Sequence, residues 1–452
     1  MPSISVSQVP STLSGTNSFS IYVAIADATS YGSNKFRYIL QIYEGAHASG
    51  TLKATLKLSG NTANTLIYNA SRIVDTFITN TYIDSTDSKD IHRLPGGSTT
   101  AHPFSLNDGQ LVQSGIKGGV EYSSSATTDP TEYLDLTNNN RYYIRATQDI
   151  TTGKEFDFAP YKIDGSSDKF LSNAPTTQYL KSTDYGTIAF LNDNTLFSSI
   201  GITIQVKVYD SSKSLLYTAN LTNSNANGGA IPNSETNTNA ERLVYFGSGV
   251  KNLQTQTLDS TLKTHMGNDA SVYYTIQALD GSSNAVSDLY TFYIIDRNVP
   301  GSHNYLSNPC KYDSYRLAWL NRLGAWDYFT FTKKSVEKIS TKRESIRNIL
   351  GTWGSASWDY NSWDRGKKTL TTNSTKSVTL NSGYLPEEQV SFLETLFTSP
   401  EVYIVGDTYT IPVVVKTGDF TTKSSVNDKL IQYQIGLEFS HDVPTNTHII
   451  NG

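Results

Sequence analysis

The sequence contains a single cysteine, Cys310, among its 452 residues. One cysteine excludes an intrachain disulfide, and it also excludes the paired-cysteine zinc sites that hold many small domains together. Small secreted domains normally rely on disulfides, so this shortage indicates a chain made in a reducing cytosol. With 37% hydrophobic residues, the chain is still able to bury real cores.

Long apolar runs are missing as well. No stretch approaches the roughly 20 apolar residues that a membrane-spanning helix needs. The N-terminal segment 1–6 has neither the basic head nor the apolar run of a signal peptide. We therefore expect a soluble protein that makes no contact with a membrane.

Positive charge is also scarce. The chain has 36 Lys and Arg against 41 Asp and Glu, which gives a net charge of −5. Because nucleic-acid binding needs clustered Lys and Arg, we expect no nucleic-acid partner. Cations gather only between Lys333 and Arg347, where a solvated helix or loop face is the favoured interpretation.

Motifs for catalysis and metal binding are absent too. The seven histidines are scattered, and we expect them in loops or at the surface. Asp84, Asp87 and Asp90 recur at every third residue, but the segment lacks the glycine and glutamate of a calcium loop. We therefore expect a non-enzymatic chain with no catalytic residue, no cofactor and no metal. A pair of distant carboxylates for glycoside hydrolysis stays open.

Residues that favour β-sheets are abundant, including 29 Tyr and 17 Phe. Short alternating strands separated by turn residues predict a mainly β chain whose first two domains resemble β-sandwiches. The first spans residues 1–160, with a long exposed loop at 84–110. The second spans residues 161–300, with strict alternation at 200–208 and a polar loop at 222–240.

The composition changes after residue 300, because all five tryptophans lie beyond it. Pro386 precedes a predicted helix whose apolar face is formed by Val390, Leu393, Leu396 and Phe397. Strands are predicted at 402–405, 410–416 and 430–439. These features predict an α+β domain over residues 301–452, in which one helix packs on a sheet.

Four aromatic residues in this domain follow an unusual spacing. Three tryptophans stand five residues apart, which fits neither a helix face nor a strand face, so we expect an ordered loop. Such rings either complete the core of their own domain, contact a protein partner or stack on a sugar, and all three alternatives stay open. The four residues are Trp353, Trp358, Tyr360 and Trp363.

Residues 315–331 read YRLAWLNRLGAWDYFTF. This segment resembles the W-L-N-x-x-G-x-W-D-Y-F-x-F segment of structural proteins from tailed bacteriophages of aquatic and Bacteroidetes hosts. Residues 36–45, 399–403 and 428–435 resemble other parts of these proteins. The resemblance implies a virion protein of the tail or baseplate, synthesised in the host cytoplasm, such as a distal-tail or hub-adaptor component. The predicted sheet with one helix is similar to tail-tube-like modules that form rings.

We therefore expect a non-enzymatic virion protein that assembles with itself, in a ring of three, six or twelve copies, and with other tail proteins. One alternative is a carbohydrate-binding host-recognition protein, in which the four aromatic residues above stack on a host glycan. Another alternative is a head or neck decoration protein. The residues expected at the assembly interface are Arg316, Trp319, Trp326, Tyr328, Phe329 and Tyr433.

Overall fold

The computed structural model describes most of the chain. The described residues are 4–17, 22–27, 35–78, 83–84, 89–94, 103–106, 110–147, 158–163, 169–192, 203–222, 242–297, 312–421 and 431–443, without residues 124, 136–138, 281, 353, 355 and 365. The polar loop expected at 222–240 lies almost wholly outside these residues.

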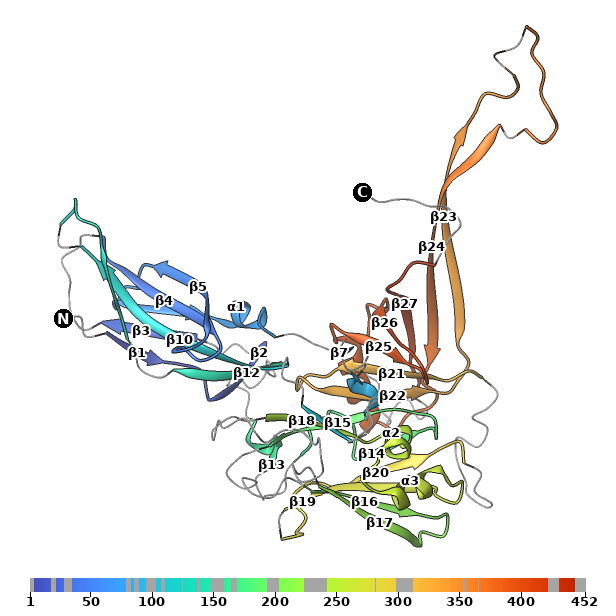
Figure 1. Cartoon of the computed structure of the whole chain (residues 1–452), viewed down its shortest axis with the longest axis horizontal. Helices are drawn as coiled ribbons and strands as arrows, with labels where there is room; N and C mark the ends of the chain where they lie inside the picture. The colour runs from blue at the N-terminus through green and yellow to red at the C-terminus, as the bar shows by residue number, and fades with distance from the viewer. Residues whose placement is uncertain are drawn as a thin grey trace. The chain divides into compact units, whose positions relative to one another are not determined.

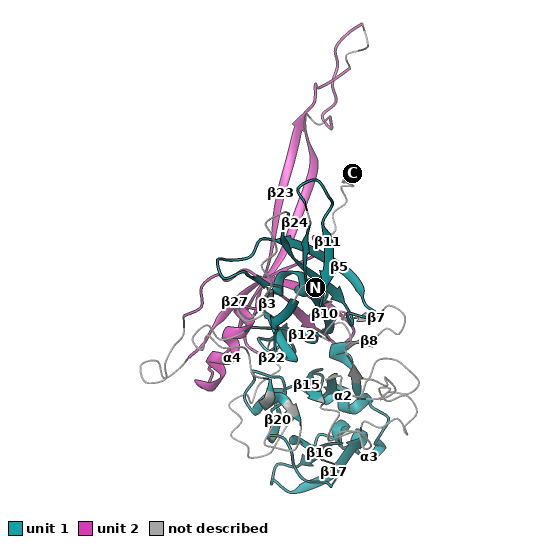
Figure 2. Ribbon diagram, turned by 90° about the vertical axis from the view of Figure 1, so that its left-hand side faces the viewer, with its two compact units in different colours: residues 1–307, 318–329 teal, residues 308–317, 330–452 magenta. Residues whose placement is uncertain are grey.

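The described chain is built mainly from β-strands, which confirms the predicted fold class (Figure 1). Its contacts divide it into two compact units (Figure 2). Unit 1 comprises residues 1–307 and 318–329, and unit 2 comprises residues 308–317 and 330–452.

A first β-sandwich occupies the N-terminal part of unit 1. Its smaller sheet has the order β1-β3-β6, and its larger sheet has the order β2-β12-β10-β4-β5, with β11 paired to β10. Residues from both sheets, among them Ile25, Leu40 and Ile116, share one buried core, on which the short helix α1 packs. The elements are β1 (Ile4–Gln8), β2 (Leu13–Asn17), β3 (Tyr22–Asp27), β4 (Arg37–Glu44), β5 (Thr51–Leu58), β6 (Thr65–Asn69), α1 (Ser71–Asp75), β10 (Leu111–Tyr122), β11 (Thr131–Leu134) and β12 (Asn140–Thr147).

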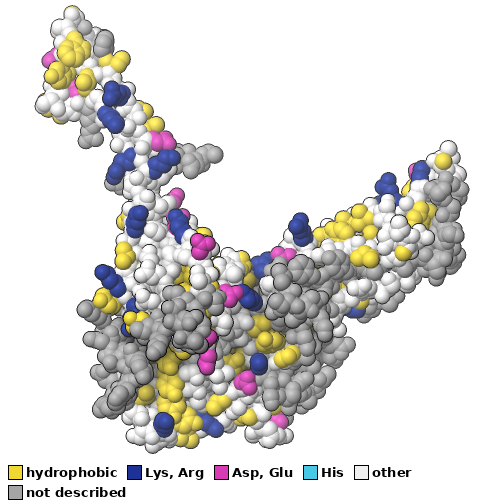
Figure 3. Space-filling model, turned by 180° about the vertical axis from the view of Figure 1, so that it is seen from behind, with side chains coloured by type: hydrophobic (Ala, Val, Ile, Leu, Met, Phe, Trp, Pro, Cys, Tyr) yellow, Lys and Arg dark blue, Asp and Glu magenta, His cyan; other side chains and the backbone are white. Residues whose placement is uncertain are grey.

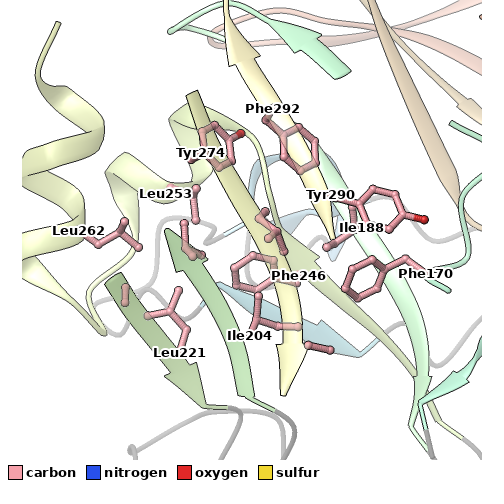
Figure 4. Close-up of a cluster of buried hydrophobic side chains, with 14 of the residues drawn as sticks. Phe170, Ile188, Ile204, Leu221, Phe246, Leu253, Leu262, Tyr274, Tyr290 and Phe292 are labelled. Carbon is pink, nitrogen blue, oxygen red and sulfur yellow. The ribbon is translucent and has the colours of Figure 1, made fainter. Parts of the chain in front are cut away.

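A second β-sandwich follows in the same unit. Its sheets have the orders β13-β15-β18-β9 and β14-β20-β19-β16-β17, and both contribute to the core in Figure 4. The elements are β9 (Phe104–Leu106), β13 (Lys162–Ile163), β14 (Thr177–Leu180), β15 (Thr187–Asn192), β16 (Thr203–Tyr209), β17 (Leu215–Thr222), β18 (Arg242–Gly247), α2 (Val250–Thr255), α3 (Ser260–Gly267), β19 (Tyr273–Leu279) and β20 (Tyr290–Ile294). The remaining short elements of unit 1 are β7 (Ile83–Asp84), β8 (Lys89–Asp90), η1 (Ile91–Arg93) and η2 (Ala159–Tyr161).

Strand β16 shows why these residues form a half-buried sheet. Ile204, Val206 and Val208 are fully buried, whereas the residues between them are partly exposed. This period of two is the signature of a strand with one face on the core.

Helix α3 is fixed at both ends. The Asp259 side chain accepts hydrogen bonds from the backbone N–H groups of Thr261 and Leu262, at 2.9 and 2.8 Å. At the other end, the buried Arg297 guanidinium donates to the carbonyl oxygens of Met266 and Ser271. These contacts satisfy backbone groups that a helix end leaves without partners.

Four tyrosines form a row across the outer face of the five-stranded sheet. Tyr179 stacks on Tyr293 with ring centroids 5.6 Å apart, Tyr293 lies 5.3 Å from Tyr273, and Tyr273 stacks on Tyr209 at 4.8 Å. Each pair is directly opposite in the strand register. Because the rings face one another, the row acts as a set of cross-strand pairs that stabilise the sheet.

A seven-stranded sheet has the order β22-β21-β25-β26-β27-β24-β23. Helix α4 buries Val390, Leu393 and Leu396, and its last residue, Phe397, contacts Phe420, which stacks on Tyr433. The expected α+β arrangement with one described helix is therefore present in the C-terminal part of the chain. The elements are β21 (Tyr315–Leu320), β22 (Trp326–Phe331), β23 (Val336–Arg347), β24 (Lys367–Asn381), α4 (Glu388–Phe397), β25 (Val402–Val405), β26 (Thr410–Val415) and β27 (Gln434–Phe439).

Two sequence-based expectations are wrong for the described residues. The segment 84–110 is not simply an exposed loop, because Ile91, Leu94 and Phe104 are at least 95% buried and β9 pairs with β18 in the second sandwich. The cation-rich segment ending at Arg347 is neither helix nor loop, because it forms strand β23. The many polar residues in both segments obscure the apolar pattern that would have predicted the buried residues of 84–110 and strand β23.

The tyrosine row generates a prediction about stability. Tyr273 contacts two neighbouring rings, so Tyr273→Ala is expected to lower the free energy of unfolding by about 1–3 kcal/mol, measured by urea denaturation. Tyr273→Phe keeps the ring and is the matched control, with an expected change below about 0.5 kcal/mol. Equal losses in both variants would show that ring stacking does not stabilise this sheet.

Candidate functional site

The segment that resembles phage structural proteins forms a β-hairpin of β21 and β22. Its turn is organised by Asn321, whose side-chain oxygen accepts from the N–H groups of Leu323 and Ala325 at 2.9 and 3.0 Å. Gly324 has φ +82°, a conformation that favours glycine, and a Cβ there would lie 2.6 Å from Ile144. The Asn321 amide donates to the Leu171 carbonyl at 3.0 Å, which fixes the turn to the second sandwich.

Asp327 anchors the same hairpin inside unit 1. Its carboxylate accepts from the Ser172 hydroxyl at 2.6 Å and from the Asn173 N–H at 3.0 Å. Burial raises the pKa of Asp327 to about 6, although these hydrogen bonds partly oppose the shift. The buried carboxylate is therefore a structural anchor that becomes less favourable when it is ionised.

Tyr328 extends this buried polar network. Its hydroxyl lies 2.8 Å from His92 Nδ1 and 2.7 Å from the Thr187 hydroxyl. The His92 ring also meets the Trp326 ring edge-on, with centroids 5.0 Å apart. His92 is fully buried, so the expectation of a loop or surface histidine is wrong here. Sequence reasoning missed this residue because the whole segment 84–110 was expected to be an exposed loop, although Ile91 and Leu94 flank His92.

The residues expected at an assembly interface are therefore mostly interior. Five of the six are at most 8% exposed, and Phe329 is half-buried. Arg316 donates to the Thr330 hydroxyl at 2.9 Å. In this conformation the five side chains are buried within the chain, and their expected role at an assembly interface stays a prediction. The buried residues are Arg316, Trp319, Trp326, Tyr328 and Tyr433.

The exposed candidate site lies instead on the two-stranded ribbon β23–β24. The strands pair from Val336↔Thr379 to Arg347↔Lys367, whereas β24 pairs with β27 only at residues 377–381. The outer ten residues of β24 thus have a single neighbouring strand, which makes a ribbon about 30 Å long (Figure 1). Every residue of β23 is exposed.

The root of the ribbon is held by Glu337. Its carboxylate pairs with Lys376 at 2.9 Å and accepts from the Tyr315 hydroxyl at 2.9 Å. The Lys376 hydrogen bond holds the pKa of Glu337 below its usual range. Burial, together with Glu337, raises the pKa of Tyr315 to about 12. These contacts connect three strands at the point where the ribbon leaves the sheet.

The outer ribbon is cationic. Arg347 lies directly opposite Lys367, and Lys368, Arg343 and Lys342 are close in the register. Among the described residues none of these five cations forms an ion pair. Lys and Arg side chains line the projecting ribbon in Figure 3. Because like charges directly opposite each other are unfavourable, this arrangement is suited to an anionic partner.

The tip of the ribbon carries exposed aromatic rings. Trp358 donates from its indole N–H to the Leu350 carbonyl at 3.0 Å, and its ring lies 5.2 Å from that of Tyr360. Trp358, Tyr360 and Trp363 are 56%, 54% and 75% exposed. These three rings therefore do not complete a core, and the protein-contact and sugar-stacking alternatives stay open. Trp353 lies outside the described residues.

Within the described part of the chain, no group of three or more His, Cys, Asp or Glu side chains is placed to hold a metal ion. Asp87 is not among the described residues, so the Asp84, Asp87 and Asp90 series is not described as a whole. No helix in the described ranges has the length and apolar character needed to cross a membrane.

The ribbon was missed by sequence reasoning, although one signal for it exists. Residues 369–375 contain four threonines, and threonine favours strands. The alternation that normally identifies a strand is lacking because β23 is exposed throughout and, of the outer ten residues of β24, only Ser374 is buried.

Comparisons with known proteins add no functional argument. No protein-family model and no curated protein matches the chain. Among solved structures, the chain has a weak similarity to dimeric latent PorU from Porphyromonas gingivalis, with 11% identity and a TM-score of 0.17. The match covers 84% of this chain and 32% of that one. A TM-score this low does not establish a shared fold.

The buried carboxylate of Asp327 generates a prediction about pH dependence. Its folded pKa of about 6 exceeds the ordinary value of 3.8, so its stabilising contribution is full below pH 3.8 and is lost as the pH rises through 6. The loss amounts to about 3 kcal/mol. The Asp327→Asn side chain cannot ionise. The difference in free energy of unfolding between this variant and wild type, measured by urea denaturation, is therefore expected to change by about that amount in favour of the variant between pH 4 and pH 7. Parallel pH profiles for the two proteins would contradict the prediction.

Proposed function

We propose that this chain is a non-enzymatic structural protein of a tailed-bacteriophage virion, a tail or baseplate component that forms a symmetric oligomer. The observation that carries the proposal is the β23–β24 ribbon. Every residue of β23 is exposed, β24 is exposed at residues 367–370 and 373, and the tip displays aromatic rings.

The ribbon has the properties of a binding arm. A two-stranded hairpin without further packing is marginally stable in water. Here it also exposes large apolar side chains, with Ile339 at 60% and Leu370 at 54% exposure. A partner that covers these side chains would stabilise the ribbon by removing apolar surface from water.

The sequence supplies the support for a virion role. Residues 315–331 resemble a segment of phage structural proteins, and the structure gives this segment an internal task as a buried hairpin. Such proteins function through assembly, and a projecting arm on a β-rich body suits that function. We also propose that the C-terminal sheet with its one helix is similar to the tail-tube-like modules that form rings.

Mass photometry of the purified full-length chain tests the proposal, followed by negative-stain imaging of the particles. Closed rings of three, six or twelve copies are expected, because symmetric oligomers close their interfaces. A chain that remains monomeric at micromolar concentration would contradict self-assembly.

Host-glycan recognition is a second candidate, favoured by the exposed rings of Trp358, Tyr360 and Trp363. On a glycan array, Trp363→Ala is expected to reduce binding by about tenfold or more if these rings stack on sugar. Tyr384→Ala is the matched control, because Tyr384 is 65% exposed and lies outside the tip. The absence of any bound glycan for wild type would exclude this candidate.

A further inference from the structure

The charge of the ribbon differs in sign from that of the rest of the chain. Strands β23 and β24 contain seven Lys or Arg and two Glu, a net charge of +5. Since the whole chain has a net charge of −5, all the other residues together carry −10. Unit 1 alone has 21 Lys or Arg and 27 Asp or Glu, a net charge of −6.

We infer that the ribbon of one copy docks on the acidic body of a second copy, in a head-to-tail contact. This inference rests on the proposed self-assembly. It names the ribbon as the donor surface and the body of opposite net charge as the acceptor. The arm from residue 336 to 381, tip included, carries a net charge of +4, and its complementarity with a body of opposite sign favours this partner. The apolar side chains of the ribbon and the rings at its tip supply the surface to be buried.

The same charges disfavour the obvious alternative, in which two ribbons pair with each other. Strand β23 is an open edge with twelve exposed residues, and such edges invite pairing with another chain. Lys and Arg on an edge oppose that pairing, and here two +5 ribbons would have to approach each other. A two-fold ribbon–ribbon dimer is therefore disfavoured.

The geometry has a consequence for the type of assembly. In a head-to-tail contact, each copy donates one ribbon and accepts another, so its donor and acceptor surfaces differ. Contacts of this kind produce closed rings when the rotation between copies closes. A two-fold contact would instead end at a dimer.

A shortened variant separates donor from acceptor. Ile339 and Lys376 are directly opposite in the register, so replacing residues 340–375 by Asn-Gly closes the hairpin with a favourable two-residue turn. The Glu337–Lys376 pair at the root is kept. This ribbonless variant can accept a ribbon but cannot donate one, and thermal denaturation checks that it still folds.

Native mass spectrometry of wild type, the ribbonless variant and their mixture tests the inference. Wild type is expected to form oligomers, the ribbonless variant to be monomeric, and the mixture to contain complexes of both chains. Oligomers of wild type that exclude the ribbonless chain would indicate ribbon–ribbon contact and overturn the inference. Oligomers of the ribbonless variant alone would also overturn it, while leaving self-assembly intact. Monomeric wild type would refute the proposed self-assembly itself.

A charge-reversal variant checks the electrostatic part without shortening the chain. Lys342→Glu, Lys367→Glu and Lys368→Glu together are expected to weaken self-association by at least about tenfold, measured as an apparent Kd. Lys263→Glu, on the exposed face of α3, is the control and should not weaken it. An unchanged Kd in the triple variant would overturn the inference. So would specific binding of the wild-type protein, through its ribbon, to anionic polysaccharide or vesicles instead of to a second copy.

Discussion

Every strand must find partners for its backbone N–H and C=O groups, and this constraint organises the whole chain. In the two sandwiches and in the body of the seven-stranded sheet, neighbouring strands and shared cores meet it. Even the short segment β9 is drawn into the second sandwich, where it pairs with β18. The outer ribbon is the main departure among the described strands, because no third strand pairs with its two edges, although the Val443 N–H donates to it at the Ser374 carbonyl. That departure leaves β23 exposed along its whole length, which suits it to contact with a partner.

A second constraint acts on the hairpin of β21 and β22. Its turn places Asn321 and Asp327 among buried backbone and hydroxyl groups of the second sandwich. Burying a carboxylate is unfavourable unless hydrogen bonds satisfy it, and here two donors approach within 3.0 Å. Such a network fixes one arrangement of the hairpin, because a shifted register would leave these buried polar groups without partners. The unusual sequence of this segment is thus explained by its internal packing.

The predictable parts of the fold are those where one face is buried. The alternation at Ile204, Val206 and Val208 predicts β16, and the spacing of Val390, Leu393 and Leu396 predicts α4. Helices α2 and α3 were not predicted, because each is short and the apolar face of α3 is reduced to Leu262 and Met266. In the outer ribbon only Ser374 is buried, so no apolar period is available to identify it.

The candidate site was predicted in part for a related reason. The rings of Trp358 and Trp363 and the rings of Trp319 and Trp326 are chemically alike, but the first pair is exposed and the second is buried. Residue type favours an aromatic side chain in both environments, at an interface or in a core. Only the strand pairing distinguishes the two pairs. It places Trp358 and Trp363 beyond the end of β23, whereas Trp319 and Trp326 lie within the paired strands β21 and β22.

The ribbon also has a mechanical consequence. Both of its strands leave the sheet at the same end, so a pull on the tip stretches them together and does not slide one past the other. The load passes to the root, where five residues of β24 pair antiparallel with β27. These rungs lie perpendicular to the pull, and all five must yield together in shear. The resistance of the arm to tension therefore depends on this short root as well as on the long ribbon that it carries.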